Sequence, residues 1–168
     1  GYTLGFNSGS TLSIAPYSLA KLPYDVKKDV ALITLAVRVP EVLAVHPSLP
    51  ASSLPDLVAY ARANPGKVNF GSAGGGSITH LAGELLKAEA KIDIVHVPYK
   101  GAAPAVTDLV GGQVQMGIFD VPVLLSHIRA GKLKALAITS GRRAPALPEV
   151  PTTTEGGYPN VNSDNWYG

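Results

Sequence analysis

A glycine-rich segment at residues 71–76 is the part of the sequence best suited to binding chemistry. It follows a predicted strand at residues 67–71 and precedes a helix that Ser77 or Thr79 can cap. Glycines allow the backbone to turn tightly and to approach a ligand closely. The first N–H groups of a helix have no partner within that helix, and they carry a partial positive charge. Together with the hydroxyls of Ser72, Ser77 and Thr79, the segment predicts an anion site that needs no basic side chain.

Three well-known glycine motifs do not fit this segment. A phosphate-binding P-loop ends in Gly-Lys-Ser/Thr, whereas Gly76 is followed by Ser77 and Ile78. A dinucleotide fingerprint would need a third glycine where Thr79 stands. A hydrolase nucleophile elbow needs a glycine two residues before its serine, and Ser72 has a phenylalanine there. The remaining alternative to an anion site is a flexible connector with an ordinary helix cap.

A second polar segment, residues 7–11, reads Asn-Ser-Gly-Ser-Thr and follows residues 1–6, which predict a strand. Two such loops facing each other across a cleft would hold one small ligand, although a plain surface turn is the alternative. Tyr99 and Asp120 also come at the ends of predicted strands. Because ligands of open α/β sheets bind outside the carboxyl ends of the strands, we expect these positions to share one edge.

Catalytic and metal-binding patterns are absent from the sequence. The chain has no cysteine, which excludes thiolate metal sites and cysteine nucleophiles. Its four histidines lack the spacing of metal ligands. His80 lies near the glycine segment, and Glu84 follows one helical turn later, which indicates a hydrogen bond rather than a catalytic pair. We therefore predict no catalytic residue, no metal and no cofactor.

The composition is that of a folded protein without a nucleic-acid or membrane-spanning segment. Of the 168 residues, 46% are hydrophobic and 15% are charged, which is enough apolar surface for a core. The net charge is only +2, and the basic residues are scattered rather than clustered on one face, so we predict no nucleic-acid partner. No run of 18 apolar residues occurs, so we predict no direct insertion into a membrane.

From residue 52 onward, helical and strand patterns alternate, which indicates an α/β sheet. We expect helices at about residues 54–63, 77–90, 102–110 and 122–130, and strands at 67–71, 92–97, 114–119 and 133–139. The apolar run at 133–139 suits a strand covered on both faces, as in parallel sheets.

The first 50 residues differ from the rest. The apolar runs at residues 30–39 and 42–45, split by Pro40 and Glu41, predict long strands that pass between two lobes. We expect residues 40–136 to form one lobe. Residues 1–39 and 137–168 would together form part of the other.

Several segments, in their order along the chain, closely resemble the substrate-binding proteins of tripartite tricarboxylate transporters, the Bug family. They are KLPYD at 21–25, ANPGKVNFGSAG at 63–74, HLAGEL at 80–85, HVPYKG at 96–101, DLVGGQV at 108–114, AGKL at 130–133, ALPEVPT at 146–152 and WYG at 166–168. The resemblance covers essentially the whole chain.

The resemblance implies a two-lobed α/β fold of the type II periplasmic-binding-protein kind. It has mixed, largely parallel sheets flanked by helices, with one lobe complete and one partial. It implies a periplasmic protein that captures a small carboxylate between the lobes and delivers it to membrane permease subunits. No signal peptide is recognisable, so we expect the chain to be an internal segment of a longer protein.

The resemblance also implies the ligand-binding residues. They are Ser8, Ser10 and Thr11 in the first-lobe loop, Gly71, Ser72, Ala73, Gly74, Ser77 and His80 in the second-lobe loop, and Asp120 beside the cleft. The position after Asp120 is often polar in the family, whereas this chain has Val121. Two alternatives remain open at this point: a sensor module that docks on a signalling partner, and an enzyme acting on an anionic substrate with His80 as its base.

Overall fold

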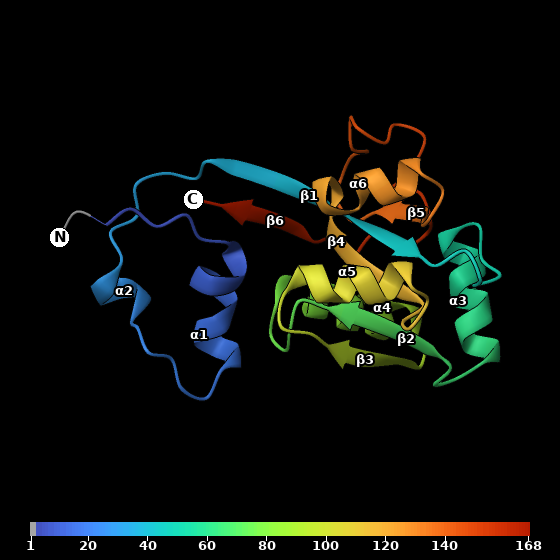
Figure 1. The fold of residues 1–168 in the computed structure, drawn as a ribbon, viewed down its shortest axis with the longest axis horizontal. Helices are drawn as coiled ribbons and strands as arrows, with labels where there is room; N and C mark the ends of the chain where they lie inside the picture. Colours follow the sequence, from blue (N-terminus) through green and yellow to red (C-terminus); the bar gives the residue numbers. More distant parts are fainter. Residues whose placement is uncertain (1–2) are drawn as a thin grey trace.

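The computed structural model describes residues 3–168, whose strands form one six-stranded mixed sheet (Figure 1). The strands are β1 (Val37–Val45), β2 (Val68–Ser72), β3 (Ile94–Pro98), β4 (Met116–Asp120), β5 (Lys134–Ile138) and β6 (Asp164–Tyr167). Their order is β3-β2-β4-β1-β5, and β6 pairs with β1. Strand β2 runs parallel to β3 and β4, whereas β1 runs antiparallel to β4, β5 and β6. The carboxyl ends of β2, β3 and β4 therefore lie at one edge of the sheet.

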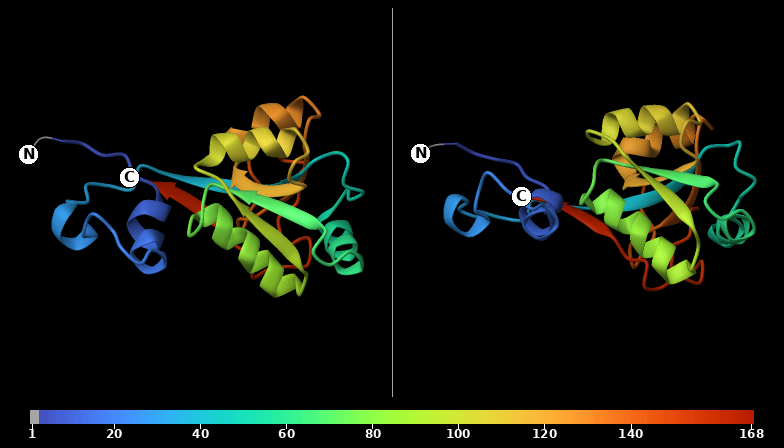
Figure 2. Two further views of the ribbon diagram at one scale, coloured as in Figure 1. Left: turned by 60° about the horizontal axis from the view of Figure 1, so that its bottom comes forward. Right: turned by 90° about the horizontal axis from the view of Figure 1, so that it is seen from below.

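Helices cover both faces of this sheet. The helical elements are the π-helix η1 (Ser10–Ile14), α1 (Ala15–Ser18), α2 (Val26–Asp29), α3 (Leu54–Ala63), α4 (Ile78–Ala90), α5 (Ala102–Val110) and α6 (Val121–Arg129). Helices α3 and α4 lie on one face, and α5 and α6 lie on the other (Figure 2). Because successive side chains of a strand point to opposite faces, Leu43 and Val45 of β1 enter the core under α3 and α4. Val42 and Ala44 enter the core under α5 and α6.

The helices and strands predicted from residue 52 onward are confirmed, with limits that differ by one or two residues. Their ends carry the local signals that the sequence offers. Ser53 caps α3 by accepting the N–H of Asp56 at 3.2 Å. Strand β5 is covered on both faces as expected, since Ala137 and Ile138 belong to opposite cores. It pairs antiparallel with β1, however, rather than lying in a parallel ladder.

Two expectations about the first 45 residues are wrong. Only the end of the first run and the second run form a strand, β1 (Val37–Val45), which continues through Pro40 and Glu41, whereas residues 30–36 lie outside any strand. A strand needs a partner for its N–H and C=O groups, and β6 pairs with β1 only over four residues, from Val37 to Pro40. Residues 3–6 also lie outside any strand. The start of that predicted N-terminal strand, residues 1–2, falls outside the described residues.

Residues 3–36 extend to one side of the sheet and are joined to it by β1 and β6 (Figure 1). Apolar side chains stay exposed there and line an open groove of about 1370 Å³, among them Leu4, Phe6, Leu32 and Ile33. Among the described residues, no helix has the length and apolar character needed to cross a membrane.

Candidate functional site

The glycine segment forms a tight loop between β2 and α4, at the sheet edge where the three parallel strands end. Gly74 and Gly76 have φ angles of +134° and +75°, which side-chain-bearing residues rarely adopt. A Cβ atom at Gly76 would also lie 2.5 Å from the hydroxyl oxygen of Ser18. Glycine is therefore required at residue 76, both by the turn and by the close approach of α1.

The start of α4 presents backbone donors to this loop. Ser77 is the N-cap residue, and its Oγ accepts the N–H of His80 at 3.3 Å. The N–H of Ile78 donates to Oγ of Ser10 at 3.1 Å, which joins two polar segments that lie 68 residues apart. Within residues 3–168, the N–H groups of Gly75 and Thr79 have no hydrogen-bond partner. Thr79 is buried, whereas Gly75 is exposed two residues before the N-cap, so the Gly75 donor is free to bind an anion.

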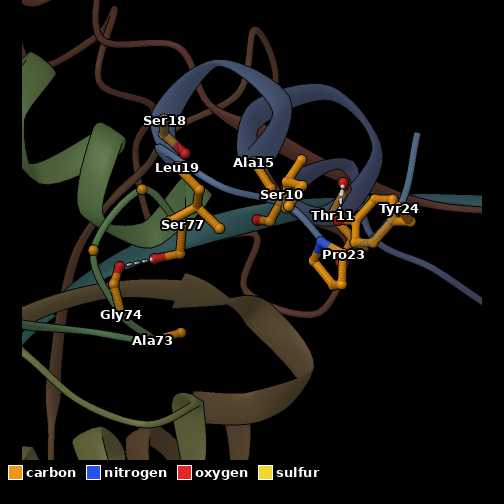
Figure 3. A pocket seen from close by; sticks show the side chains of 13 residues that line it. Ser10, Thr11, Ala15, Ser18, Leu19, Pro23, Tyr24, Ala73, Gly74 and Ser77 are labelled. Atoms are coloured by element: carbon orange, nitrogen blue, oxygen red, sulfur yellow. Dashed lines mark hydrogen bonds between the residues drawn. The ribbon is translucent and has the colours of Figure 1, made fainter. Parts of the chain in front are cut away.

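A cavity of about 370 Å³ lies between the glycine loop and the N-terminal helical segment (Figure 3). It is lined by Ser10, Thr11, Ala15, Ser18, Leu19, Leu22, Pro23, Tyr24, Ala73, Gly74, Gly75, Gly76 and Ser77. Ser10 and Ser77 approach it from opposite sides. No charged side chain is among these lining residues, so an anion here would be held by backbone N–H groups and hydroxyls. Five of the ten predicted ligand-binding residues thus line one cavity: Ser10, Thr11, Ala73, Gly74 and Ser77.

The other predicted loop residues lie outside this cavity lining. Ser8 forms a β-bridge with Tyr167, and its Oγ is 3.5 Å from Oγ1 of Thr11. Gly71 is buried in β2. Ser72 is fully buried, and its Oγ lies 2.6 Å from Nε2 of His96. Gly71 and Ser72 therefore support the glycine loop from β2, whereas Ser8 joins the N-terminal segment to β6.

His80 supports the loop from α4. Its Nδ1 accepts the N–H of Gly76 at 3.1 Å, and its Nε2 lies 3.7 Å from Oε1 of Glu84. His80 and Glu84 face each other as expected, but their 3.7 Å separation is too long for the predicted hydrogen bond. The imidazole stacks on His96 with ring centroids 3.9 Å apart. Burial, followed by the neighbouring His80, lowers the pKa of His96.

Asp120 lies at the end of β4, and its carboxylate accepts hydrogen bonds from two side chains of β6. It accepts hydrogen bonds from Nδ2 of Asn165 at 3.2 Å and from the hydroxyl of Tyr167 at 2.6 Å. Burial raises the pKa of Asp120, and these two hydrogen bonds oppose that rise. The side chain therefore links β4 to β6, and it is not among the residues lining the cavity.

Residues 1–168 match the family model described as "Tripartite tricarboxylate transporter family receptor". The chain belongs to this receptor family. It is 40% identical to Protein BugT of Bordetella pertussis over 168 residues, which cover 99% of this chain and 52% of BugT. The family predicted from the sequence is thus confirmed.

Two solved structures of similar proteins contain carboxylates. Rpa4515 of R. palustris, solved with adipate, is 33% identical with a TM-score of 0.93, over 96% of this chain and 54% of that protein. MatC of Rhodopseudomonas palustris, solved with malate, is 30% identical with a TM-score of 0.89, over 97% of this chain and 55% of that protein. The predicted α/β fold of the periplasmic-binding-protein class is confirmed. The receptor chain spans about half the length of the relatives it matches.

The receptor chain also contains a buried acidic group that the sequence analysis missed. Glu41 is fully buried in β1, directly opposite Asp120 of β4. Its Oε2 accepts a hydrogen bond from the hydroxyl of Ser163, and its Oε1 has no partner within the described residues. Burial raises the pKa of Glu41 to about 8, and the nearby carboxylates of Asp120 and Asp164 add to the rise. The signal that could have found it is the position of Glu41 between the apolar runs at 30–39 and 42–45, which indicates a buried carboxyl.

Among residues 3–168, no group of three or more histidine, aspartate or glutamate side chains could hold a metal ion.

Proposed function

We propose that this chain captures a small carboxylate between its two polar loops and, in the periplasm, delivers it to the membrane permease subunits of a tripartite tricarboxylate transporter. The observation that carries the proposal is the hydrogen bond from the N–H of Ile78 to Oγ of Ser10, beside a cavity lined by both loops. Residues 40–136 would form one lobe, and residues 1–39 with 137–168 would form part of the other. Strands β1 and β6, which join residues 3–36 to the sheet, would then be the connections that flex.

In this proposal the ligand carboxylate accepts a hydrogen bond from the N–H of Gly75, which lines the cavity and has no partner within the described residues. Hydroxyls of Ser10 and Thr11 add hydrogen bonds from the other side of the cavity. The hydroxyl of Ser77 already donates to the carbonyl of Gly74 at 2.7 Å and so holds the loop rather than the ligand. The helix start favours a negative charge by about 0.3–1 kcal/mol even at an exposed position. The adipate and malate in the structures of Rpa4515 and MatC support a carboxylate as the ligand class.

The proposal includes no reaction. Both ring nitrogens of His80, the histidine nearest the loop, face other protein groups: Nδ1 accepts the Gly76 N–H, and Nε2 faces Glu84. A base for an anionic substrate would need a free nitrogen aimed into the cavity. The site therefore supports capture and release.

A thermal-shift experiment tests capture. A ligand that binds only the folded state raises the melting temperature by mass action. We expect adipate, malate or succinate at millimolar concentration to raise the melting temperature of the chain by several degrees, and sodium phosphate to have a smaller effect. Ser10→Ala should reduce the response, whereas Ser13→Ala should keep it, because Ser13 is exposed in the same helical segment and does not line the cavity. If these acids leave the melting temperature unchanged, or if both variants respond like the wild type, capture at this cavity is wrong.

A further inference from the structure

The glycine loop is supported by a stack of three aromatic rings from three elements. Phe70 of β2 and His96 of β3 are direct neighbours in the parallel ladder, with ring centroids 4.9 Å apart. His80 of α4 stacks on His96 at 3.9 Å, with ring planes 19° apart. The stack places both imidazoles under the loop that follows β2.

Each imidazole is linked to one amide of the loop. The N–H of Gly76 donates directly to Nδ1 of His80 at 3.1 Å. The N–H of Gly74 donates to Oγ of Ser72 at 3.1 Å, and that oxygen lies 2.6 Å from Nε2 of His96. The two amides flank Gly75, whose own N–H is free. The orientation of that free donor therefore depends on the two histidines.

The hydrogen bond to His80 specifies the protonation state of its ring. A nitrogen that accepts an N–H carries a lone pair, so Nδ1 is unprotonated. The ring proton is then on Nε2, which faces Glu84 at 3.7 Å. A second proton, on Nδ1, would set the ring N–H against the N–H of Gly76, so two donors would face each other. It would also remove the only acceptor that the Gly76 N–H has within the described residues.

We propose that His80 is a positioning residue that holds the glycine loop in its binding shape only while its imidazole is neutral. Two titratable groups face this ring: Glu84 from its own helix and His96 from β3; β2 contributes the uncharged ring of Phe70. The loop is therefore held while this ring is neutral and released when Nδ1 takes a proton, because Nδ1 can then no longer accept the Gly76 N–H. The consequence for a ligand rests on the proposed function, whereas the consequence for the loop does not.

The test follows the Gly76 amide by ¹H–¹⁵N NMR of the unliganded chain between about pH 5 and pH 8. In the wild type, its resonance should titrate together with the His80 ring protons. His80→Asn places an amide oxygen near the position of Nδ1 without a titratable proton, so its Gly76 amide should stay protected and show no titration. His80→Ala removes the acceptor. Its Gly76 amide should exchange with solvent about tenfold faster at neutral pH, which corresponds to ~1.4 kcal/mol, typical of one hydrogen bond. His127→Asn, on α6, is the control and should leave the Gly76 amide unchanged.

Two results would overturn the proposal. One is a Gly76 amide that does not respond as the His80 ring titrates in the wild type. The other is His80→Asn behaving like the wild type across the pH range, since that would assign the titration to another group. If His80→Ala does not fold, the comparison of His80→Asn with the wild type decides. Adipate affinity gives a separate readout: at pH 7.5 we expect His80→Asn to match the wild type and His80→Ala to bind about tenfold more weakly. Failure of all three to bind adipate would contradict the proposed function and leave the amide result standing.

Discussion

Replacing Glu41 with glutamine should remove a pH-dependent loss of stability, so the unfolding free energy of the variant relative to the wild type should increase as the pH rises. Glu41 is fully buried, accepts a hydrogen bond from Ser163 through Oε2, and has no partner for Oε1 among residues 3–168. Burial raises its pKa from 4.5 to about 8, so the folded state holds a proton that the unfolded chain releases. A glutamine of nearly the same shape removes this difference in proton binding, because an amide does not titrate in this range.

The size of the effect follows from linkage. A folded-state pKa above the unfolded value means that stability is fully present below about pH 4.5 and is lost as the pH rises towards 8. Each tenfold difference in proton affinity corresponds to about 1.4 kcal/mol, so the wild type should lose ~2 kcal/mol between pH 5 and pH 7 through this group. The free energy of unfolding of Glu41→Gln minus that of the wild type should therefore increase by ~2 kcal/mol over the same range.

Urea denaturation followed by circular dichroism at pH 5, 6, 7 and 8 measures this difference. Glu155→Gln is a matched control, because the pKa of Glu155 is shifted in the opposite direction to that of Glu41. The hydrogen bonds of Arg143 lower the pKa of Glu155 to about 2. Both its folded and unfolded forms are ionised across most of this range, so its difference from the wild type should stay nearly constant above pH 6. A flat difference for Glu41→Gln from pH 5 to pH 8 would refute the conclusion that Glu41 is protonated in the folded chain.

Two further substitutions test contacts that the fold creates. Ser10→Ala removes the acceptor of the Ile78 N–H and should cost about 1 kcal/mol in urea denaturation, whereas Ser13→Ala should cost little; equal costs would contradict the contact. Gly83→Ala would place a Cβ 2.3 Å from the buried ring of Phe70. It should destabilise by about 1–3 kcal/mol in the same assay despite the higher helix propensity of alanine, and a variant as stable as the wild type would show that the ring can move at no cost.

Local signals were enough to predict the elements from residue 52 onward. Caps such as Ser53 and Ser77, and the glycine after α5, act on their own helix and are visible in a few neighbouring residues. The same reasoning failed for the first 45 residues. There the limits of β1 depend on β6, more than 100 residues later, and no local pattern gives the length of that partner.

The candidate site shows the same division. The glycine loop and its helix start were predictable, because turn geometry and unpaired helix donors follow from residue type and order. The sequence also suggested that residues 7–11 face this loop, and Ser10 and Thr11 do line the shared cavity. It gave no sign that the carboxylate of Asp120 accepts hydrogen bonds from Asn165 and Tyr167. These donors lie 45 and 47 residues further along the chain, on another strand, and no local pattern relates them to Asp120.

The sequence by itself determined the family of this chain, its order of helices and strands, and the loop that carries free backbone donors. Only the tertiary structure decided the state of its ionisable groups. His80 is an acceptor beneath the loop because Gly76 donates to it, and Glu41 favours its protonated form because two helix-covered faces exclude water around β1. The proton affinity of a side chain depends on burial and on neighbours distant in sequence, and these are fixed only when the sheet and its helices pack together.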